Sequence, residues 1–420
     1  MNILAGLSYG LLIAPGQEID FIRMNSNIES LYKIANKPVR KIIGLMSGTS
    51  FDGLDIALCE FSGSGLETKV KVINFVSKAY LPAFKEDLKS VFAKRTVDLE
   101  KLTLLNAFIG NYYAGLILES LKDWDISPSD IDLIASHGQT IYHAPRQQRE
   151  ADAYSNATFQ IGDGDHLAMK SGIITFSDFR QKHVAAGCEG APLSVYGDYL
   201  LFSNPNENRI MLNIGGISNF TFLPSAYSTE FFSSDVGPGN TLMDQFVQRH
   251  YPGKYFDQDA AIASSGKVNH QLLDALFDHD FFRSAYLKTT GPELFSLSYL
   301  NDAIQRSGLQ GLSNEDIMAT LAAFTAKAIV KAITFCVEGK GSYEIYISGG
   351  GMHNPLLTGI IEEMLGKKLK FSSDLGIEPD AKEAVLFALL ANEAVSGGKT
   401  DFGKHPGVPS ISMGKVSFPQ

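Results

Sequence analysis

Cysteine is scarce in this chain. Three cysteines occur among its 420 residues, at positions 59, 188 and 336, far apart from one another. An odd number of distant thiols provides neither a disulfide framework nor the paired spacing of a zinc site. The sequence therefore indicates a protein of a reducing compartment, and we expect a cytoplasmic location. Cys59 and Cys336 stand in apolar runs, which is typical of core residues.

A surplus of positive charge is also missing. Lysine and arginine number 36 against 46 aspartates and glutamates, which gives a formal net charge of −10. This balance argues against nucleic acid or an anionic membrane as a partner. It does not exclude a small anionic ligand, because backbone N–H groups and helix ends can hold one while a cation neutralises its charge.

Long apolar runs are absent too. No segment reaches the length of a membrane span. The short apolar stretch 3–15 has no basic residues before it and no convincing cleavage site after it, so it does not resemble a secretory signal. We expect residues 1–40 to be an extension ahead of the first domain. Whether this extension is ordered is open.

The length and the element pattern predict an α/β protein with two domains. We expect an N-terminal domain at 41–200 and a C-terminal domain at 201–420, with the last helix packing back toward the first domain. The expected strands are 42–46, 54–58, 70–76, 131–136, 173–176, 210–214, 217–223 and 343–348. The expected helices are 82–94, 99–124, 314–336 (capped by Asn314) and 382–395.

A Gly-rich turn joins the first two expected strands. Its residues, GTSFDG at 48–53, supply backbone N–H groups, two hydroxyls and a carboxylate. Glycine lets the backbone approach a bulky anion, and consecutive N–H groups form an anion-binding concavity. The residues alone leave two interpretations open: a phosphate cradle or an ordinary hairpin turn.

Two further Gly-rich turns follow in order. Residues 213–216 (NIGG) again join two expected strands, and residues 348–351 (SGGG) stand between a strand and a helix. Two hairpins can grip phosphates from opposite sides of a cleft, while the third turn can admit an adenosine. Together the three turns resemble those of the actin-like ATPase superfamily, which includes sugar kinases, chaperones and actin. The resemblance implies two ribonuclease H-like domains with an ATP cleft between them.

Within that superfamily, the sequence GLMSGTSFDGLD at 44–55 resembles the signature of the anhydro-N-acetylmuramic acid kinases. The same resemblance is carried by SHGQT at 136–140, QIGD at 160–163, SDFR at 177–180, AAG at 185–187, GAPL at 190–193, LNIGGISN at 212–219, GPGN at 237–240, SGGGMHNP at 348–355 and PDAKEA at 379–384. It spans roughly residues 41–415. The sequence departs from the family pattern at His183, Cys188, Glu189 and Val236, all in expected loops near the sugar.

The resemblance implies an unusual kinase reaction. The sugar O6 is locked in a 1,6-anhydro bridge, so water must attack the anomeric carbon while O6 accepts the γ-phosphoryl group of ATP. The products are N-acetylmuramic acid 6-phosphate and ADP, and the pathway is cell-wall sugar recycling. The family also implies Mg²⁺ and a homodimer.

The reaction requires a general base for the attacking water. Asp178 matches the catalytic aspartate of the family, although a capping aspartate, or one paired with Arg180, is the structural alternative. We expect His137, Arg180 and Asp235 at the substrate, where each has an alternative role as a loop anchor or ion-pair partner. The expected nucleotide-binding residues are Gly48, Thr49, Ser50, Phe51, Asp52, Gly53, Leu54, Asp55, Gly215, Gly216, Gly349, Gly350 and Gly351.

The protein ligands of Mg²⁺ are not assigned by the sequence. Met46 stands where ordinary sugar kinases often have an aspartate, so Asp52, Asp55 and Asp235 are only candidates. The Lys382–Glu383 pair is expected to be structural.

Two other functions compete with this interpretation. A conventional sugar or acyl kinase on the same fold would transfer phosphate to an oxygen that is already free. An actin-like filament protein or a chaperone-like clamp would need long insertions or a peptide-binding domain, and the chain has no room for such a domain.

Overall fold

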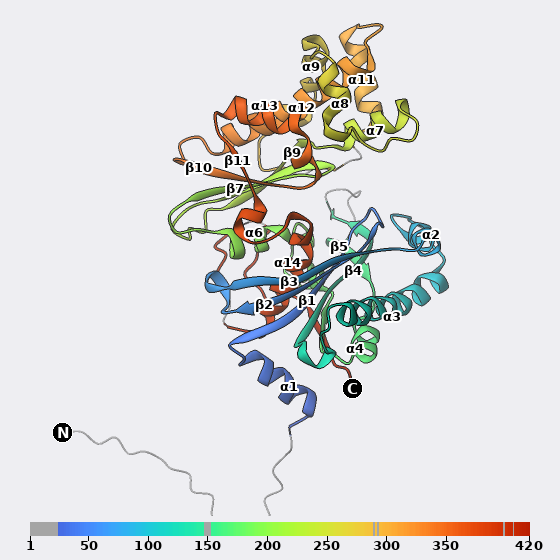
Figure 1. Cartoon of the computed structure of the whole chain (residues 1–420), viewed down its shortest axis with the longest axis vertical. Helices are drawn as coiled ribbons and strands as arrows, with labels where there is room; N and C mark the ends of the chain where they lie inside the picture. Colours follow the sequence, from blue (N-terminus) through green and yellow to red (C-terminus); the bar gives the residue numbers. More distant parts are fainter. Residues whose placement is uncertain (1–23, 147–152, 289, 292–293, 398–399, 406) are drawn as a thin grey trace, which may run out of the picture.

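The computed structural model describes residues 24–146, 153–288, 290–291, 294–397, 400–405 and 407–420 (Figure 1). Most of the expected N-terminal extension, residues 1–23, lies outside the described residues. The remainder forms helix α1 (Ser26–Ala35), which begins where the Asn25 side chain accepts hydrogen bonds from the N–H groups of Asn27 and Ile28.

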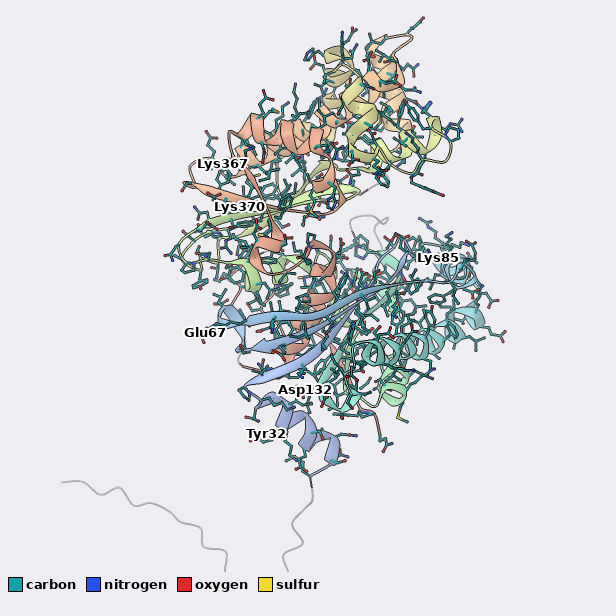
Figure 2. The ribbon with its side chains drawn as sticks, in the orientation of Figure 1. Tyr32, Glu67, Lys85, Asp132, Lys367 and Lys370 are labelled. Carbon is teal, nitrogen blue, oxygen red and sulfur yellow. The ribbon has the colours of Figure 1, made fainter. Side chains whose placement is uncertain are left out.

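The first sheet contains β1 (Val39–Ser47), β2 (Gly53–Ser62), β3 (Lys69–Ala79), β4 (Leu133–Ala144), β5 (Ala157–Ile161), β6 (Thr175–Ser177) and β12 (Lys415–Ser417). Its order is β12-β6-β4-β1-β2-β3, and β5 pairs with β4. Strands β1 to β3 are antiparallel, whereas β4 is parallel to both β1 and β6. Asp132, labelled in Figure 2, accepts a 2.9 Å hydrogen bond from the Lys41 N–H and aligns the start of β4 with β1.

The second sheet repeats this plan with β7 (Asn208–Ile214), β8 (Ile217–Leu223), β9 (Phe232–Pro238), β10 (Tyr343–Ser348) and β11 (Leu369–Phe371). Its order is β11-β10-β7-β8-β9, again three antiparallel strands followed by two parallel ones. Two sheets with the same internal order confirm the predicted α/β fold of two ribonuclease H-like halves.

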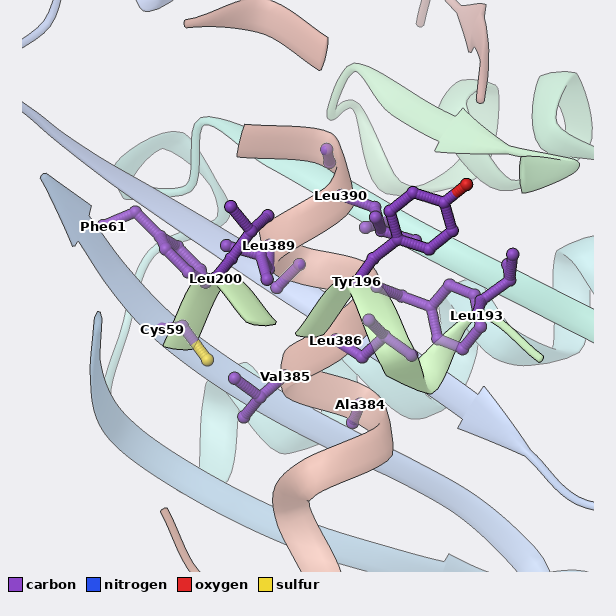
Figure 3. Packing of buried hydrophobic residues seen from close by; sticks show 14 of the residues in the cluster. Cys59, Phe61, Leu193, Tyr196, Leu200, Ala384, Val385, Leu386, Leu389 and Leu390 are labelled. Carbon is purple, nitrogen blue, oxygen red and sulfur yellow. The ribbon is translucent and has the colours of Figure 1, made fainter. Parts of the chain in front are cut away.

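Helices cover both faces of the first sheet. One face packs against α2 (Pro82–Val91), α3 (Leu99–Asp123) and α4 (Gly164–Ser171). The other packs against α6 (Ser194–Phe202) and α14 (Lys382–Val395), which lie between the two sheets (Figure 1). Figure 3 shows α14 residues such as Leu386 and Leu389 beside Tyr196 of α6 and Phe61 of β2.

Gly44 on β1 permits the close approach of α14. A Cβ atom at this position would lie 1.9 Å from the Ala384 carbonyl oxygen, so only glycine allows the helix to sit so near the strand. The last long helix of the chain is therefore part of the core of the first half.

The second sheet has its own helical layer, formed by α12 (Asn314–Cys336) and α13 (Pro355–Leu365). Around α12 lie α7 (Thr241–His250), α8 (Ala261–Ser265), α9 (His270–Phe277), α10 (Asp280–Arg283) and α11 (Leu297–Ser307). The cap of α12 is Ser313, which accepts the Asp316 N–H, so the expectation of Asn314 as the cap was wrong by one residue. Among the described residues, α12 is the one helix that is long and apolar enough to cross a membrane. However, 83% of its 18-residue apolar stretch is buried inside the protein.

Candidate active site

The first Gly-rich turn connects β1 to β2 and is anchored by Phe51. Phe51 has φ = 59°, and its buried ring meets Phe92 edge-on with centroids 5.0 Å apart. Leu54 is also fully buried. The side chains of Phe51 and Leu54 therefore belong to the core, and only their backbone groups remain available to a nucleotide. By contrast, Thr49, Ser50 and Asp52 are exposed.

A buried glutamine side chain holds this turn through hydrogen bonds. Gln139 on β4 accepts a 2.6 Å hydrogen bond from the Ser47 hydroxyl and donates one of 3.1 Å to the Gly48 carbonyl. The Tyr80 hydroxyl donates to Ser47 at 2.8 Å, and burial raises the pKa of Tyr80 strongly, so this hydroxyl stays protonated. The Gly48 carbonyl oxygen is therefore hydrogen-bonded to the protein interior, and it does not repel an anion bound at the turn. The sequence interpretation did not include Gln139, although the SHGQT motif contains it.

The second turn, Gly215–Gly216, is braced by the start of α7. The Gly239 and Thr241 N–H groups donate to the Gly216 carbonyl at 2.8 and 3.1 Å, and the Asn240 N–H donates to the Gly215 carbonyl at 2.8 Å. Both carbonyls of the turn are therefore occupied. The Gly215 N–H donates to the Ile217 carbonyl at 3.2 Å, whereas Gly216 is exposed and is the residue of this turn that can present its N–H group to a ligand.

The third turn lies directly against the end of β7. A Cβ atom at Gly349 would come within 2.7 Å of the Ile214 carbonyl oxygen, and one at Gly351 within 2.2 Å of the Ile214 side chain. Gly349 also has φ = 82°, while Gly350 is exposed. The fold thus brings the second and third turns together, as an adenosine diphosphate moiety would require.

Asp178 stands at the junction of β6 and α5 (Phe179–Ala185). Its φ and ψ of 55° and 44° are left-handed, and its side chain makes no capping hydrogen bond. A non-glycine residue carries some strain in this region, less for aspartate than for most, and residues held in it cluster at active sites. The carboxylate is 26% exposed and forms an ion pair with Lys415, not with Arg180.

Arg180, two residues after Asp178, is half-buried and pairs with the buried His137 of β4. Arg180 donates from Nε to His137 Nε2 at 2.9 Å and from Nη1 to the Gly190 carbonyl at 2.7 Å. Because Nε2 accepts, the imidazole is neutral, and burial lowers the pKa of His137 well below its usual value. Burial also lowers the pKa of Arg180 to about 10, which leaves the guanidinium charged at neutral pH. These bonds favour anchoring roles for both residues.

Asp235 lies on β9 of the second half, apart from the His137–Arg180 pair of the first half. Its carboxylate accepts a 2.8 Å hydrogen bond from the Thr290 N–H, and burial raises its pKa to about 6. The structure therefore joins two of the three expected substrate residues and places the third on the other sheet.

Several carboxylates lie close together near the first Gly-rich turn. Burial raises the pKa of Asp55, and the negative charges of Asp380 and Asp52 raise it further. Among the described residues, no group of three or more His, Cys, Asp or Glu side chains is close enough to hold a metal ion alone. Mg²⁺ commonly takes one or two carboxylates plus phosphate oxygens and water. The carboxylates of Asp52, Asp55 and Asp380 repel one another beside the first Gly-rich turn, as expected of groups that a cation would hold together. Of the three, Asp55 fits the pattern of a magnesium ligand best.

The departures from the family pattern occupy structural positions. His183 is fully buried; its Nδ1 accepts the Gly190 N–H at 3.0 Å and its Nε2 donates to the Gly407 carbonyl at 2.8 Å. Val236 is buried in the core of the second half. Cys188 and Glu189 are partly exposed on the loop that follows α5.

Comparison with known proteins adds an independent finding. The family model described as anhydro-N-acetylmuramic acid kinase matches residues 40–412. The protein of that name from Pseudoalteromonas atlantica is 52% identical over 94% of this chain and 100% of its own length. Those of Pseudoalteromonas translucida and Caldanaerobacter subterraneus are 50% and 39% identical, over 94% and 93% of this chain and all of their own lengths.

Proposed function

This chain belongs to the anhydro-N-acetylmuramic acid kinase family, and from that membership we propose how its residues carry out the reaction. The protein is an ATP-dependent kinase that opens 1,6-anhydro-N-acetylmuramic acid and phosphorylates O6, which yields N-acetylmuramic acid 6-phosphate and ADP for cell-wall sugar recycling. The observation that carries this conclusion is the match over residues 40–412, which includes all three Gly-rich turns and Asp178.

The central step needs a base because the anhydro sugar has no free O6. Water attacks C1 and gives its proton to the Asp178 carboxylate. The C1–O6 bond breaks, and its electron pair passes with O6 to the γ-phosphorus as ADP leaves. The strained position of Asp178 at a strand end supports this assignment, since the carboxylate is not used for capping.

Each of the three turns binds a different part of the nucleotide. Residues 48–55 hold the β- and γ-phosphates, Gly215 and Gly216 approach from the second half, and residues 349–351 border the adenosine. The bonded carbonyls of Gly48, Gly215 and Gly216 support these roles, because they are not turned toward the phosphates. The Gly215 N–H donates to the Ile217 carbonyl at 3.2 Å, so in the second turn the exposed Gly216 offers its N–H group. When bound, Mg²⁺ would neutralise phosphate charge beside Asp55. Arg180 and His137 shape the sugar site as anchors, and Asp235 faces it from the second half.

The domain bounds, the oligomeric state and the cellular location are proposed on the same basis. We place the first domain at 41–200 and the second at 201–420, with α14 and β12 returning to the first sheet. A homodimer is proposed from family membership. A cytoplasmic location is supported by the three free cysteines.

The test is incubation with ATP, Mg²⁺ and 1,6-anhydro-N-acetylmuramic acid in oxygen-labelled water, quenched before the anomeric hydroxyl exchanges. We expect sugar 6-phosphate with the label at C1, and Asp178→Asn should lower kcat at least about 100-fold. N-acetylmuramic acid, whose O6 is free, is the control substrate. A conventional kinase would phosphorylate the control and leave the anhydro sugar unchanged. Full activity of Asp178→Asn would remove Asp178 from the role of base.

A further inference from the structure

The final strand of the chain is built around the residues that flank Asp178. In β12, Lys415 pairs with Ser177 and Val416 with Phe176 of β6. Just before the strand, Gly414 has φ = 100°, and a Cβ atom there would lie 3.1 Å from the Phe179 ring. The segment 414–416 therefore packs against the residues immediately before and after Asp178.

The Lys415 side chain completes this arrangement with an ion pair to the Asp178 carboxylate. The lysine is 66% exposed and the aspartate 26%. Within the described part of the chain, Lys415 is the only cation that forms a hydrogen bond or ion pair with Asp178. Arg180, the nearest cation in the sequence, is committed to His137 and the Gly190 carbonyl.

We propose that Lys415 is a positioning residue for Asp178, which fixes the direction of the carboxylate toward the attacking water. The proposal rests on the proposed role of Asp178 as the base. Among the described residues, no other hydrogen bond or ion pair fixes this carboxylate, and it does not cap α5. Position 415 lies outside the stretch 40–412 that the family model matches, so that model assigns it no role.

The test compares Lys415→Met, Lys415→Arg and Lys404→Met with the unaltered enzyme, with kcat and KM for the anhydro sugar measured separately. Lys404→Met removes the same charge from another exposed residue of the C-terminal stretch. We expect Lys415→Met to lower kcat about threefold while KM for the anhydro sugar stays unchanged, an effect of the size of an exposed ion pair. Lys415→Arg should restore kcat, Lys404→Met should leave it unchanged, and KM for ATP should stay constant throughout.

Melting temperatures of all variants separate positioning from folding. A Lys415→Met enzyme that melts earlier but keeps its kcat, or one whose lower kcat is not restored by Lys415→Arg, would overturn the proposal, because the lysine would then only hold the strand. Asp178→Asn separates this failure from that of the proposed function. If Asp178→Asn is inactive and Lys415→Met keeps its kcat, only the role of Lys415 fails.

Discussion

At the scale of single residues, Gln139 shows how a buried amide can hold the turn that we propose as the phosphate site. The side chain is completely buried and satisfies both the Ser47 hydroxyl and the Gly48 carbonyl. Removing such a residue leaves buried polar groups without partners, at a cost of about 1–3 kcal/mol for each group. The same loss frees the Gly48 carbonyl to turn toward the ligand.

We therefore expect Gln139→Leu to raise KM for ATP about tenfold, which corresponds to about 1.4 kcal/mol, with a much smaller change in KM for the sugar. Steady-state kinetics with each substrate varied in turn measures both constants. Gln271→Leu is the matched control, because that amide bonds the Ser307 carbonyl at 2.6 Å in the helical cluster of the second half. Equal effects of the two substitutions on KM for ATP would contradict the role assigned to Gln139.

Sequence reasoning identified Asp178 and Arg180 as a possible pair, but the structure gives each a different partner. Lys415 lies 237 positions from Asp178, and His137 lies 43 positions from Arg180. No local pattern signals such contacts, because they arise only when β4, β6 and β12 align in one sheet. The sequence therefore indicated these residues as candidates, whereas their pairing could not be predicted from it.

At the scale of elements, the long strands and helices were predictable because their apolar periodicity is strong. Helix α12 and strand β10 have the predicted bounds. The short elements α8, α10 and β5 were missed, since five residues or fewer carry little periodicity. Longer elements of the second half, among them α7, α11 and β9, were not predicted either. The glycine turns were predicted from composition, but their packing against one another required the fold.

That packing gives a prediction for the third turn. A Cβ atom at Gly351 would lie 2.2 Å from the Ile214 side chain, so Gly351→Ala must displace the turn from the end of β7. We expect KM for ATP to rise at least about tenfold while the protein remains folded. Gly359→Ala, in α13 with nothing within 4 Å of the added Cβ, should bind ATP normally and be slightly more stable. Calorimetric ATP titration of both variants checks this, and normal ATP affinity of Gly351→Ala would contradict it.

At the scale of the whole molecule, the duplicated turn predicted two halves, but the sequence did not reveal what ties them together. The Lys382–Glu383 pair was expected to be structural. Lys382 has such a role, because on α14 it forms a 2.7 Å ion pair with Asp198 on α6, a partner that the sequence did not indicate. Asp198 in turn accepts a 2.8 Å hydrogen bond from Thr221 on β8 of the second sheet. These three side chains link the first half to the second.

The link is buried, with Lys382 17% and Asp198 5% exposed, so breaking it from one side leaves an unpaired charge inside the protein. We expect Lys382→Met to lower the free energy of unfolding by about 3 kcal/mol. Asp198→Asn should also destabilise, but the double variant should lose less than the sum of the two, because no buried charge is then left alone. Urea unfolding of all four proteins measures the coupling. Strictly additive losses would mean that the two residues stabilise the protein independently and that the ion pair does not join the halves.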